Sequence, residues 1–377
     1  MVVIRMPNHV ISNHGPCYLI AEIGNNHGGS LEVALEMIRQ AAACGVQAVK
    51  FQKRHNREVF TRRMYDQPYE GSNSFGDTYG AHREFLELGR ADYVSLMKES
   101  ERCGVDFLCT PFDLKSAEFL RELNVPAYKI SSFDVKNLPF IRYVASFGKP
   151  MFISTGGSTM DDIREVYREV VGTGTPLCLL HCVSAYPAPE DSLELRTISR
   201  FCAEFPQALV GYSGHDDGTA AALLAYAMGA SVVEKHFTLD RQARGSDHRF
   251  SLDPTRMKMQ AHQLAQASAM LGTGARTRMV IEERAISRLG KGLYAARPLA
   301  AGSRVTEKDI CIRSPEAHLT PNKLDQVLGR RLRRALRTEE PVRLEDLVEG
   351  QTTGQASRPR SRRLRRTSLV SQKGRSP

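Results

Sequence analysis

Polar and ionisable residues that could do chemistry recur directly after short apolar runs in this 377-residue chain. The residues at these positions are Glu22, Lys50, Gln52, Thr110, Lys129, Ser131, Ser132, Ser154, Thr155, Ser184, Tyr186, Ser213, His215, Lys235 and His236. The set is rich in lysines, hydroxyl groups and imidazoles, and carboxylates do not dominate it. Lysines and hydroxyl groups that converge on one pocket suit a small polyanion, such as a phosphate ester that also carries a carboxylate.

Two histidines in this set, His215 and His236, end neighbouring apolar runs. Their imidazoles could bind one divalent metal ion, with water in the remaining positions. A single histidine would more often be a core residue, but a pair at adjacent positions favours a metal site. Glu22 is a candidate for proton transfer or for orienting a water molecule, and its structural alternative is a salt bridge to one of the lysines.

The apolar runs alternate with helical patterns, which predicts the element order of a parallel α/β fold. The β-rich runs cover residues 18–24, 48–52, 106–110, 127–131, 151–155, 177–182, 209–213 and 232–237. Eight strand–helix units in about 270 residues predict a (β/α)8 TIM barrel, in which the carboxyl ends of the strands form the active site. A doubly wound open sheet is the structural alternative, although it more often has fewer strands.

Composition changes along the chain predict four segments. Residues 1–275 form the barrel domain, residues 276–286 a linker, and residues 287–350 a small domain with short β-like runs and turns. Within the barrel, residues 65–89 are too long for a minimal loop and predict an excursion over one barrel face. Residues 351–377 form a basic tail with eight Lys and Arg, and we expect this tail to be disordered.

Charge and hydropathy exclude several classes of protein. The net charge is +10, but the tail carries +8 of it, so the first 350 residues do not favour nucleic-acid binding. No apolar run is long enough for a membrane span, and the N-terminus lacks the apolar core of a signal peptide, so we expect a cytoplasmic protein. Eight scattered cysteines without a C-x-x-C pair indicate free thiols, and Cys178, His181 and Cys182 do not share one strand face as a metal site requires.

Ordered motifs from residue 15 to 260 resemble the N-acetylneuraminate (sialic acid) synthase family. These motifs are AEIGNNHGGS (21–30), VKFQK (49–53), KISS (129–132), FGKPMFISTGGS (147–158), HCVSAYPAP (181–189), GYSGHDDG (211–218), EKHFTLD (234–240) and GSDHRFSLDP (245–254). The segment GKGLYAARPLAAGSRVTEKDI (290–310) is similar to the antifreeze-like, or SAF, domain that this family carries after its barrel. The resemblance covers the chain up to about Gly350.

The resemblance implies a metal-dependent condensation of phosphoenolpyruvate with an N-acylated hexosamine aldehyde, usually N-acetylmannosamine. The product is a sialic-acid-type nonulosonic acid, and phosphate leaves by C–O cleavage. The implied phosphoenolpyruvate ligands are Lys50, Thr110, Lys129, Ser132, Ser154, Ser184 and Ser213. His215 and His236 match metal ligands for Mn²⁺, Mg²⁺ or Co²⁺, and Glu22 matches the acidic residue that stabilises a cationic C2 or orients the attacking water.

The resemblance also implies a sugar site and a homodimer. Gln52, Tyr186 and Asp247 match sugar-site positions, and Asp134 stands where other members have Glu. Arg313 is one residue out of step with an arginine of the SAF domain that reaches the N-acyl group in bacterial members. In the family, the SAF domain of one subunit covers the barrel of its partner, so we expect a domain-swapped homodimer.

Other functions are open at this point. The acceptor could be a legionaminate or pseudaminate precursor or a 6-phosphorylated sugar. An octulosonate-synthase-like enzyme is another alternative, which the SAF-like segment disfavours. A non-catalytic sugar- or nucleic-acid-binding protein would explain the basic tail but would leave the paired histidines without a role.

Overall fold

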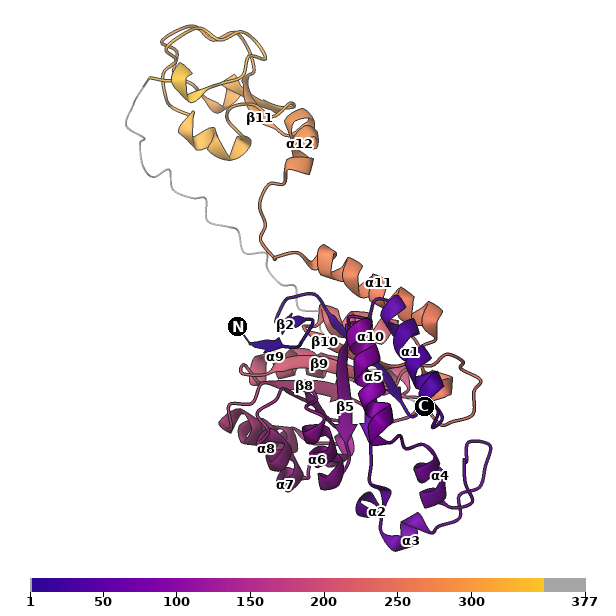
Figure 1. The fold of residues 1–377 in the computed structure, drawn as a ribbon. Helices are drawn as coiled ribbons and strands as arrows, with labels where there is room; N and C mark the ends of the chain where they lie inside the picture. The colour runs from indigo at the N-terminus through magenta and orange to yellow at the C-terminus, as the bar shows by residue number, and fades with distance from the viewer. Residues whose placement is uncertain (1, 349–377) are drawn as a thin grey trace, which may run out of the picture. The chain divides into compact units, whose positions relative to one another are not determined.

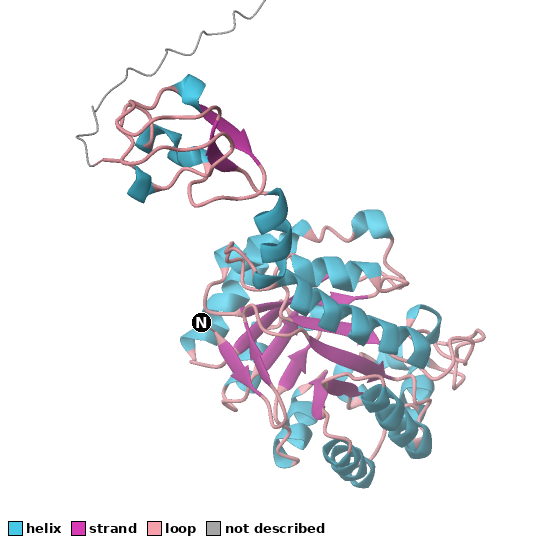
Figure 2. Cartoon of the chain, turned by 90° about the horizontal axis from the view of Figure 1, so that it is seen from above, coloured by secondary structure: helices cyan, strands magenta, loops and turns pink. Residues whose placement is uncertain are grey.

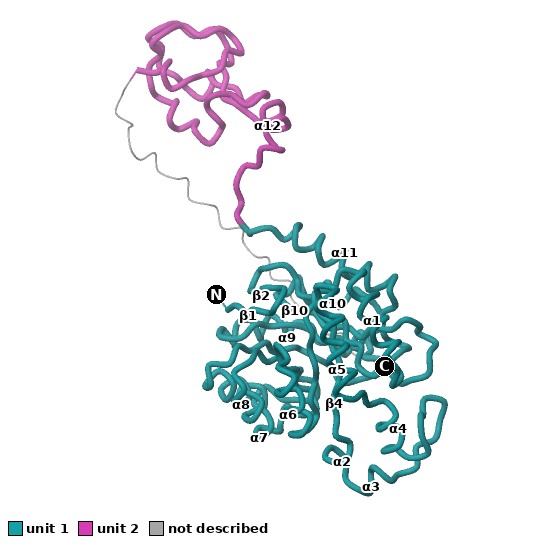
Figure 3. Tube along the Cα trace, in the orientation of Figure 1, with its two compact units in different colours: residues 1–274 teal, residues 275–377 magenta. Residues whose placement is uncertain are grey.

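The computed structural model describes residues 2–348 and contains two compact units that divide between Gly274 and Ala275 (Figure 3). Residues 276–286, which the sequence predicts as a linker, overlap the start of helix α12 (Glu283–Leu289). The predicted basic tail at 351–377 lies outside the described residues. No helix within residues 2–348 is long and apolar enough to cross a membrane.

The first unit contains a closed barrel of eight parallel strands surrounded by helices (Figures 1 and 2). The strands are β3 (Tyr18–Gly24), β4 (Ala48–Lys53), β5 (Asp106–Pro111), β6 (Tyr128–Ile130), β7 (Met151–Ser154), β8 (Leu177–Cys182), β9 (Leu209–Gly214) and β10 (Val232–His236). All eight predicted strands are confirmed to within one residue at each end. Pairing of β10 with β3 closes the sheet, so the open-sheet alternative was wrong.

Helices follow the strands and cover the outside of the barrel. They are α1 (Leu31–Ala43), α5 (Arg90–Arg102), α6 (Leu114–Glu122), α7 (Leu138–Ala145), α8 (Met160–Gly172), α9 (Arg196–Glu204), α10 (Ala220–Ala227) and α11 (Pro254–Leu271). Local sequence sets where several of them begin. For example, Thr159 caps α8 through its side chain while Asp162 bonds back to the Thr159 backbone, which satisfies two donors at the helix start.

The barrel interior has an apolar layer and a polar layer because side chains alternate along each strand. Ile20, Ala48, Leu108, Ala127, Phe152, Leu180 and Val232 belong to one buried apolar cluster. Two residues further along the same strands stand Glu22, Lys50, Thr110, Lys129, Ser154, Cys182 and Glu234. The same face of each strand therefore carries the apolar core first and the polar groups at its carboxyl end.

A hairpin of β1 (Val3–Arg5) and β2 (Val10–Ser12) precedes the barrel, and the sequence analysis did not predict it. Ile4 and Ile11 of this hairpin are fully buried in the apolar cluster of the barrel interior. The buried carboxylate of Asp106 accepts hydrogen bonds from the Asn8 backbone N–H and the Tyr18 hydroxyl, both at 2.9 Å. The hairpin thus closes the apolar end of the barrel, opposite the polar layer.

The second strand–helix unit contains the predicted excursion. Before α5 the chain forms three short helices, α2 (Asn56–Val59), α3 (Arg62–Tyr65) and α4 (Tyr79–Phe85). Aromatic rings hold this segment together, since the Tyr79 ring packs edge-on against Phe60 and Tyr69.

The second unit has a small β-rich core. Strands β11 (Gly292–Ala295) and β12 (Ile310–Arg313) pair antiparallel, and single bridges join the surrounding loops. Its core consists of Leu293, Ala295, Leu299, Val305, Leu319, Val327, Leu332, Leu336, Val342 and Leu347. This agrees with the prediction of a small domain that differs in pattern from the barrel.

His27, in the loop after β3, should make the stability of the protein depend on pH. Burial lowers the pKa of its imidazole to about 4 from a usual value of 6.5, so it is neutral in the folded protein. The unfolded chain binds the proton below pH 6.5, so stability is lost as pH falls from 6.5 toward 4. We expect the free energy of unfolding in urea to decrease between pH 7.5 and pH 5.0 in both proteins. The decrease should be about 2 kcal/mol smaller in H27Q than in the wild type. H262Q, on the exposed surface of α11, is the control, and equal losses in H27Q and wild type would contradict this account.

Candidate active site

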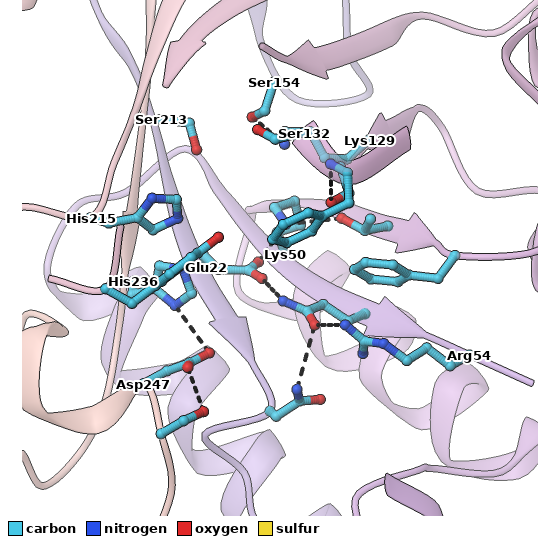
Figure 4. A pocket seen from close by; sticks show the side chains of 18 of the residues that line it. Glu22, Lys50, Arg54, Lys129, Ser132, Ser154, Ser213, His215, His236 and Asp247 are labelled. Atoms are coloured by element: carbon cyan, nitrogen blue, oxygen red, sulfur yellow. Dashed lines mark hydrogen bonds and ion pairs between the residues drawn. The ribbon is translucent and has the colours of Figure 1, made fainter. Parts of the chain in front are cut away.

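A cavity of about 590 Å³ opens at the carboxyl ends of the barrel strands. Twelve of the fifteen site residues that the resemblance implies line it, and Ser131 lines it as well: Glu22, Lys50, Gln52, Thr110, Lys129, Ser132, Ser154, Tyr186, Ser213, His215, His236 and Asp247 are the twelve. The close-up in Figure 4 shows side chains from opposite strands pointing toward one another in this space. The structure therefore brings most of the residues predicted at the strand ends together around one cavity.

Lys50 is one of two buried cations in the deep part of the cavity. Its Nζ lies 2.7 Å from Glu22 Oε2 and donates a hydrogen bond to Thr110 Oγ1 at 3.0 Å. Although burial disfavours the ammonium, Glu22 and Glu234 raise the pKa of Lys50 above its usual value. Glu22 thus makes the salt bridge that was its structural alternative, and it also lines the cavity.

Lys129 is the second buried cation, and it is less well compensated. Its Nζ donates a 2.6 Å hydrogen bond to Ser154 Oγ and lies 3.9 Å from Glu234 Oε1. Burial lowers the pKa of Lys129, and Glu234 offsets this only in part. For Glu234 itself, burial opposes ionisation, but Lys129 and Lys50 hold the pKa below its usual value. A dianion placed between the two lysines would stabilise both ammonium groups.

His215 and His236 come together as predicted, with ring centroids 5.3 Å apart. The Nδ1 atom of His215 lies 2.9 Å from the Val183 carbonyl and donates to it, which leaves Nε2 with a free lone pair. Burial and the neighbouring His236 lower the pKa of His215 to about 4, so the ring is neutral. The Nδ1 atom of His236 is buried without a hydrogen-bond partner. His215, neutral and oriented by a carbonyl, and His236, with an unsatisfied buried nitrogen, fit a divalent metal such as Mn²⁺, Mg²⁺ or Co²⁺.

Aromatic and acidic neighbours fix the two imidazoles. Tyr186 packs against His215 at a centroid distance of 4.2 Å, and Phe250 packs edge-on against His236 at 5.1 Å. Asp247 Oδ2 lies 3.8 Å from His236 Nδ1. Although burial opposes its ionisation, the nearby His236 and a hydrogen bond from Ser246 lower the pKa of Asp247. A carboxylate is thus held beside the candidate metal ligands.

Gln52 connects the deep part of the cavity to its outer part. Its Nε2 donates to Glu22 Oε1 at 2.6 Å, and its Oε1 accepts from Arg54 Nη2 at 2.6 Å (Figure 4). These two bonds fix the orientation of the amide, so Gln52 presents no freely rotating group to a ligand.

Three residues that the resemblance implies, and Thr155 and Lys235 from the strand ends, are not among those that line the cavity. Ser184 lies close to Ser132, which does line it, because a Cβ built on Gly156 would meet Ser184 Oγ at 2.2 Å and Ser132 Oγ at 3.0 Å. Asp134 is half-buried in a short helical turn and accepts a hydrogen bond from Asn137 Nδ2. Arg313 belongs to the second unit, where it pairs with Glu339.

Sequence reasoning missed three charged residues of the cavity, Glu234, Arg54 and Arg83. Glu234 was detectable, because it stands two residues before His236 on the same strand and therefore faces the same way. Arg54 continues the series of Lys50 and Gln52 by the same rule. Lys235 faces the other side of β10, where its Nζ donates to Asp216 Oδ1 at 2.8 Å.

The chain matches two family models. The NeuB family model covers residues 37–276, and the SAF domain model covers residues 290–348. Both matches agree with the resemblance noted in the sequence and with the order of the two units.

Individual proteins match over nearly the whole chain. Human N-acetylneuraminate-9-phosphate synthase is 35% identical over 344 residues, which are 91% of this chain and 96% of that protein. The N,N'-diacetyllegionaminic acid synthase of Campylobacter jejuni is 31% identical over 86% of this chain and 98% of that protein. The structure of an N-acetylneuraminic acid synthetase from Leptospira borgpetersenii superposes with a TM-score of 0.67 and 30% identity, over 75% of this chain and 95% of that one.

The histidine pair generates a prediction about metal binding. We expect the chelator-treated wild-type protein to bind one Mn²⁺ per chain by isothermal titration calorimetry. H236A should weaken that binding at least about 100-fold, because one of two imidazole ligands is lost while the fold is kept. H55A, which removes a half-exposed histidine outside the cavity, is the control. Unchanged Mn²⁺ affinity in a folded H236A would exclude His236 as a ligand.

Proposed function

Because the chain belongs to the NeuB family of phosphoenolpyruvate-dependent condensing synthases, we propose that its acceptor is the open-chain aldehyde of an N-acylated hexosamine. N-acetylmannosamine or a close analogue is the proposed sugar, and the product is a sialic-acid-type nonulosonic acid plus phosphate. The observation that carries this proposal is the pair of buried lysines, Lys50 and Lys129, at 2% and 3% exposure beside the histidine pair. A phosphate ester with a carboxylate supplies the negative charge that these cations need.

Phosphoenolpyruvate would bind between Lys50 and Lys129. The hydroxyl groups of Thr110 and Ser154, which already bond these ammonium groups, would share them with the ligand, and those of Ser132, Ser184 and Ser213 would complete the contacts. The metal held by His215 and His236 would act as a Lewis acid that makes the aldehyde carbon more electrophilic.

The carbon–carbon bond forms when C3 of phosphoenolpyruvate attacks the aldehyde carbon, and the aldehyde oxygen takes a proton to become a hydroxyl group. C2 then carries cationic character, and the carboxylates of Glu22 and Glu234, which lie beside the two lysines, would stabilise it. Water adds to C2 and gives up a proton, for which Glu22 is the proposed acceptor or orienting group. Phosphate finally leaves with the oxygen that joined it to C2, which restores the carbonyl group of the product.

Gln52, Tyr186 and Asp247 would contact the sugar, and Asp134 and Arg313 are retained as proposed sugar contacts from the sequence. The relatives support more than one acceptor, since one is named for a legionaminic acid product and another for a 9-phosphate product. A legionaminate or pseudaminate precursor and a 6-phosphorylated sugar are therefore the alternatives to N-acetylmannosamine.

One assay tests the proposed reaction. Enzyme, Mn²⁺ and phosphoenolpyruvate carrying ¹⁸O in the bridge to C2 are mixed with a panel of N-acylated hexosamines and their 6-phosphates. We expect phosphate release that depends on the sugar, with ¹⁸O recovered in phosphate. Label retained in the sugar acid, or no release with any member of the panel, would refute the reaction.

Gly156 generates a prediction about the phosphoenolpyruvate half of the site. Its backbone angle suits any residue, but an added Cβ would push against the hydroxyl groups of Ser184 and Ser132. We expect G156A to fold normally and to raise the KM for phosphoenolpyruvate about 10-fold. A change of this size corresponds to the loss of one hydrogen bond from a serine hydroxyl group to the charged substrate. G172A, where an added Cβ meets nothing within 4 Å, is the control, and an unchanged KM in G156A would exclude these serines as ligands.

We also propose that the protein is a homodimer in which the SAF domain covers the partner's barrel. The support is an apolar segment in which Met279, Val280 and Ile281 are 56%, 81% and 84% exposed. Such a run is typical of a surface that packs against another chain. Analytical ultracentrifugation should give a dimer for the wild type and a shift toward monomer for V280E/I281E. A fully active wild-type monomer would overturn the proposal.

A further inference from the structure

Arg54 lies at the outer end of the cavity and has an unsatisfied hydrogen-bonding group. Its guanidinium stacks on the Phe112 ring at 3.6 Å, and its Nη2 donates to Gln52. The side chain is 8% exposed, yet its Nη1 is buried without a hydrogen-bond partner. An unsatisfied buried donor of a charged group is costly, so this position favours a bound acceptor.

Arg83 lines the same cavity from helix α4. Its Nε and Nη2 donate to the Tyr79 hydroxyl at 3.1 and 3.0 Å, which holds the guanidinium in place and engages only one edge of it. The two arginines repel one another, and burial together with Arg83 lowers the pKa of Arg54 to about 10.

Neither arginine has a carboxylate within 4 Å among residues 2–348. The acidic groups that act on Arg54 have other partners, since Glu87 pairs with Lys53 at 2.7 Å and Glu22 with Lys50 at 2.7 Å. Asp247, on which Arg83 acts, lies 3.8 Å from His236 Nδ1. Two adjacent guanidinium groups without an anion, one of them buried, are thus a site for a ligand with at least two negative charges. A purely structural role, in which Arg54 only packs on Phe112, would leave the buried Nη1 unexplained.

We propose that Arg54 and Arg83 bind a phosphate monoester on the acceptor, at the carbon farthest from the aldehyde. This inference rests on the proposed function and makes the acceptor an N-acylhexosamine 6-phosphate, with the product phosphorylated at the corresponding carbon. Phosphate fits because its several oxygens accept charge-assisted N–H bonds from both guanidinium groups and carry negative charge, whereas a neutral hydroxyl group offers one oxygen and no charge.

The position along the cavity separates this phosphate from that of phosphoenolpyruvate. Gln52 stands between the two anion sites, bonded to Glu22 on one side and to Arg54 on the other. An open-chain sugar with its aldehyde near the histidines would therefore extend past Gln52 and place its far end at the arginines. Deep lysines serve the first substrate, and outer arginines serve the second.

The experiment compares N-acetylmannosamine with its 6-phosphate in full-length enzyme with Mn²⁺ and phosphoenolpyruvate. We expect the wild type to prefer the phosphorylated sugar at least about 100-fold in kcat/KM. R83M and R54M should each lower kcat/KM for the phosphorylated sugar about 10- to 100-fold, the range for one charged hydrogen bond. R83M should leave kcat/KM for the unphosphorylated sugar, and the KM for phosphoenolpyruvate, within about threefold of the wild type. R54M also removes the bond that orients Gln52, so it should lower kcat/KM for both sugars, and more for the phosphorylated one.

R57M is the matched control, because Arg57 also stacks on an aromatic ring at 3.6 Å, that of Tyr65, but does not line the cavity. It should change none of these values. Calorimetric binding of N-acetylmannosamine 6-phosphate to enzyme without phosphoenolpyruvate is a second readout. Weakened binding in R83M supports the site even where R54M fails to fold.

The two proposals fail in different ways. Equal or better turnover of the unphosphorylated sugar, or an R83M variant that affects both sugars alike, would overturn the phosphate site while the condensation stands. A raised KM for phosphoenolpyruvate in R83M would assign the arginines to the other substrate and would also overturn it. If neither sugar reacts but the 6-phosphate binds and R83M abolishes binding, the proposed reaction fails and the anion site stands.

Discussion

Two ammonium groups buried inside a barrel are the constraint on which the rest of this structure depends. Lys50 and Lys129 are removed from water, and an uncompensated buried charge costs several kcal/mol. Glu22 and Glu234 supply the opposite charge, and Thr110 and Ser154 accept the remaining hydrogen bonds. The apo site is therefore close to neutral, and it holds its cations in place before any substrate arrives. Preorganisation of this kind is what an enzyme needs to bind a polyanion without rearrangement.

The barrel makes this arrangement possible because the inward face of each strand contributes both to the apolar core and to the polar cavity. Alternation places Ile20 and Glu22, or Ala48 and Lys50, on the same inward face, so each strand contributes an apolar residue and then a polar one. The apolar layer and the N-terminal hairpin exclude water from below. Polar groups above them therefore lie in a low-dielectric surrounding that is open on one side only, which strengthens every charge interaction in the cavity.

Much of this was predictable from the sequence, and the misses have physical reasons. The eight strands were found because each is a continuous apolar run buried on both faces, and their carboxyl ends gave twelve cavity residues. The hairpin was missed because its strands have three residues each, too few to show a period. Arg83 was missed because it reaches the cavity from an irregular excursion. Asp134 is not among the residues that line the cavity, because a matching motif fixes a position along the chain but not the direction of a side chain in a helical turn.

The inner and outer parts of the cavity differ in how their charge is balanced, and this difference bears on the reaction. In the inner part, the carboxylates of Glu22 and Glu234 would repel the anionic first substrate but stabilise the cationic C2 that forms later. The two carboxylates would therefore raise the free energy of the bound ground state and lower the free energy of the transition state. In the outer part, neither Arg54 nor Arg83 has a carboxylate within 4 Å among residues 2–348, so a ligand there gains attraction with less repulsion than in the inner part. The binding energy of the acceptor phosphate at the arginines would then offset the repulsion in the inner part. In this way a group that does not react can still increase the rate of the reaction.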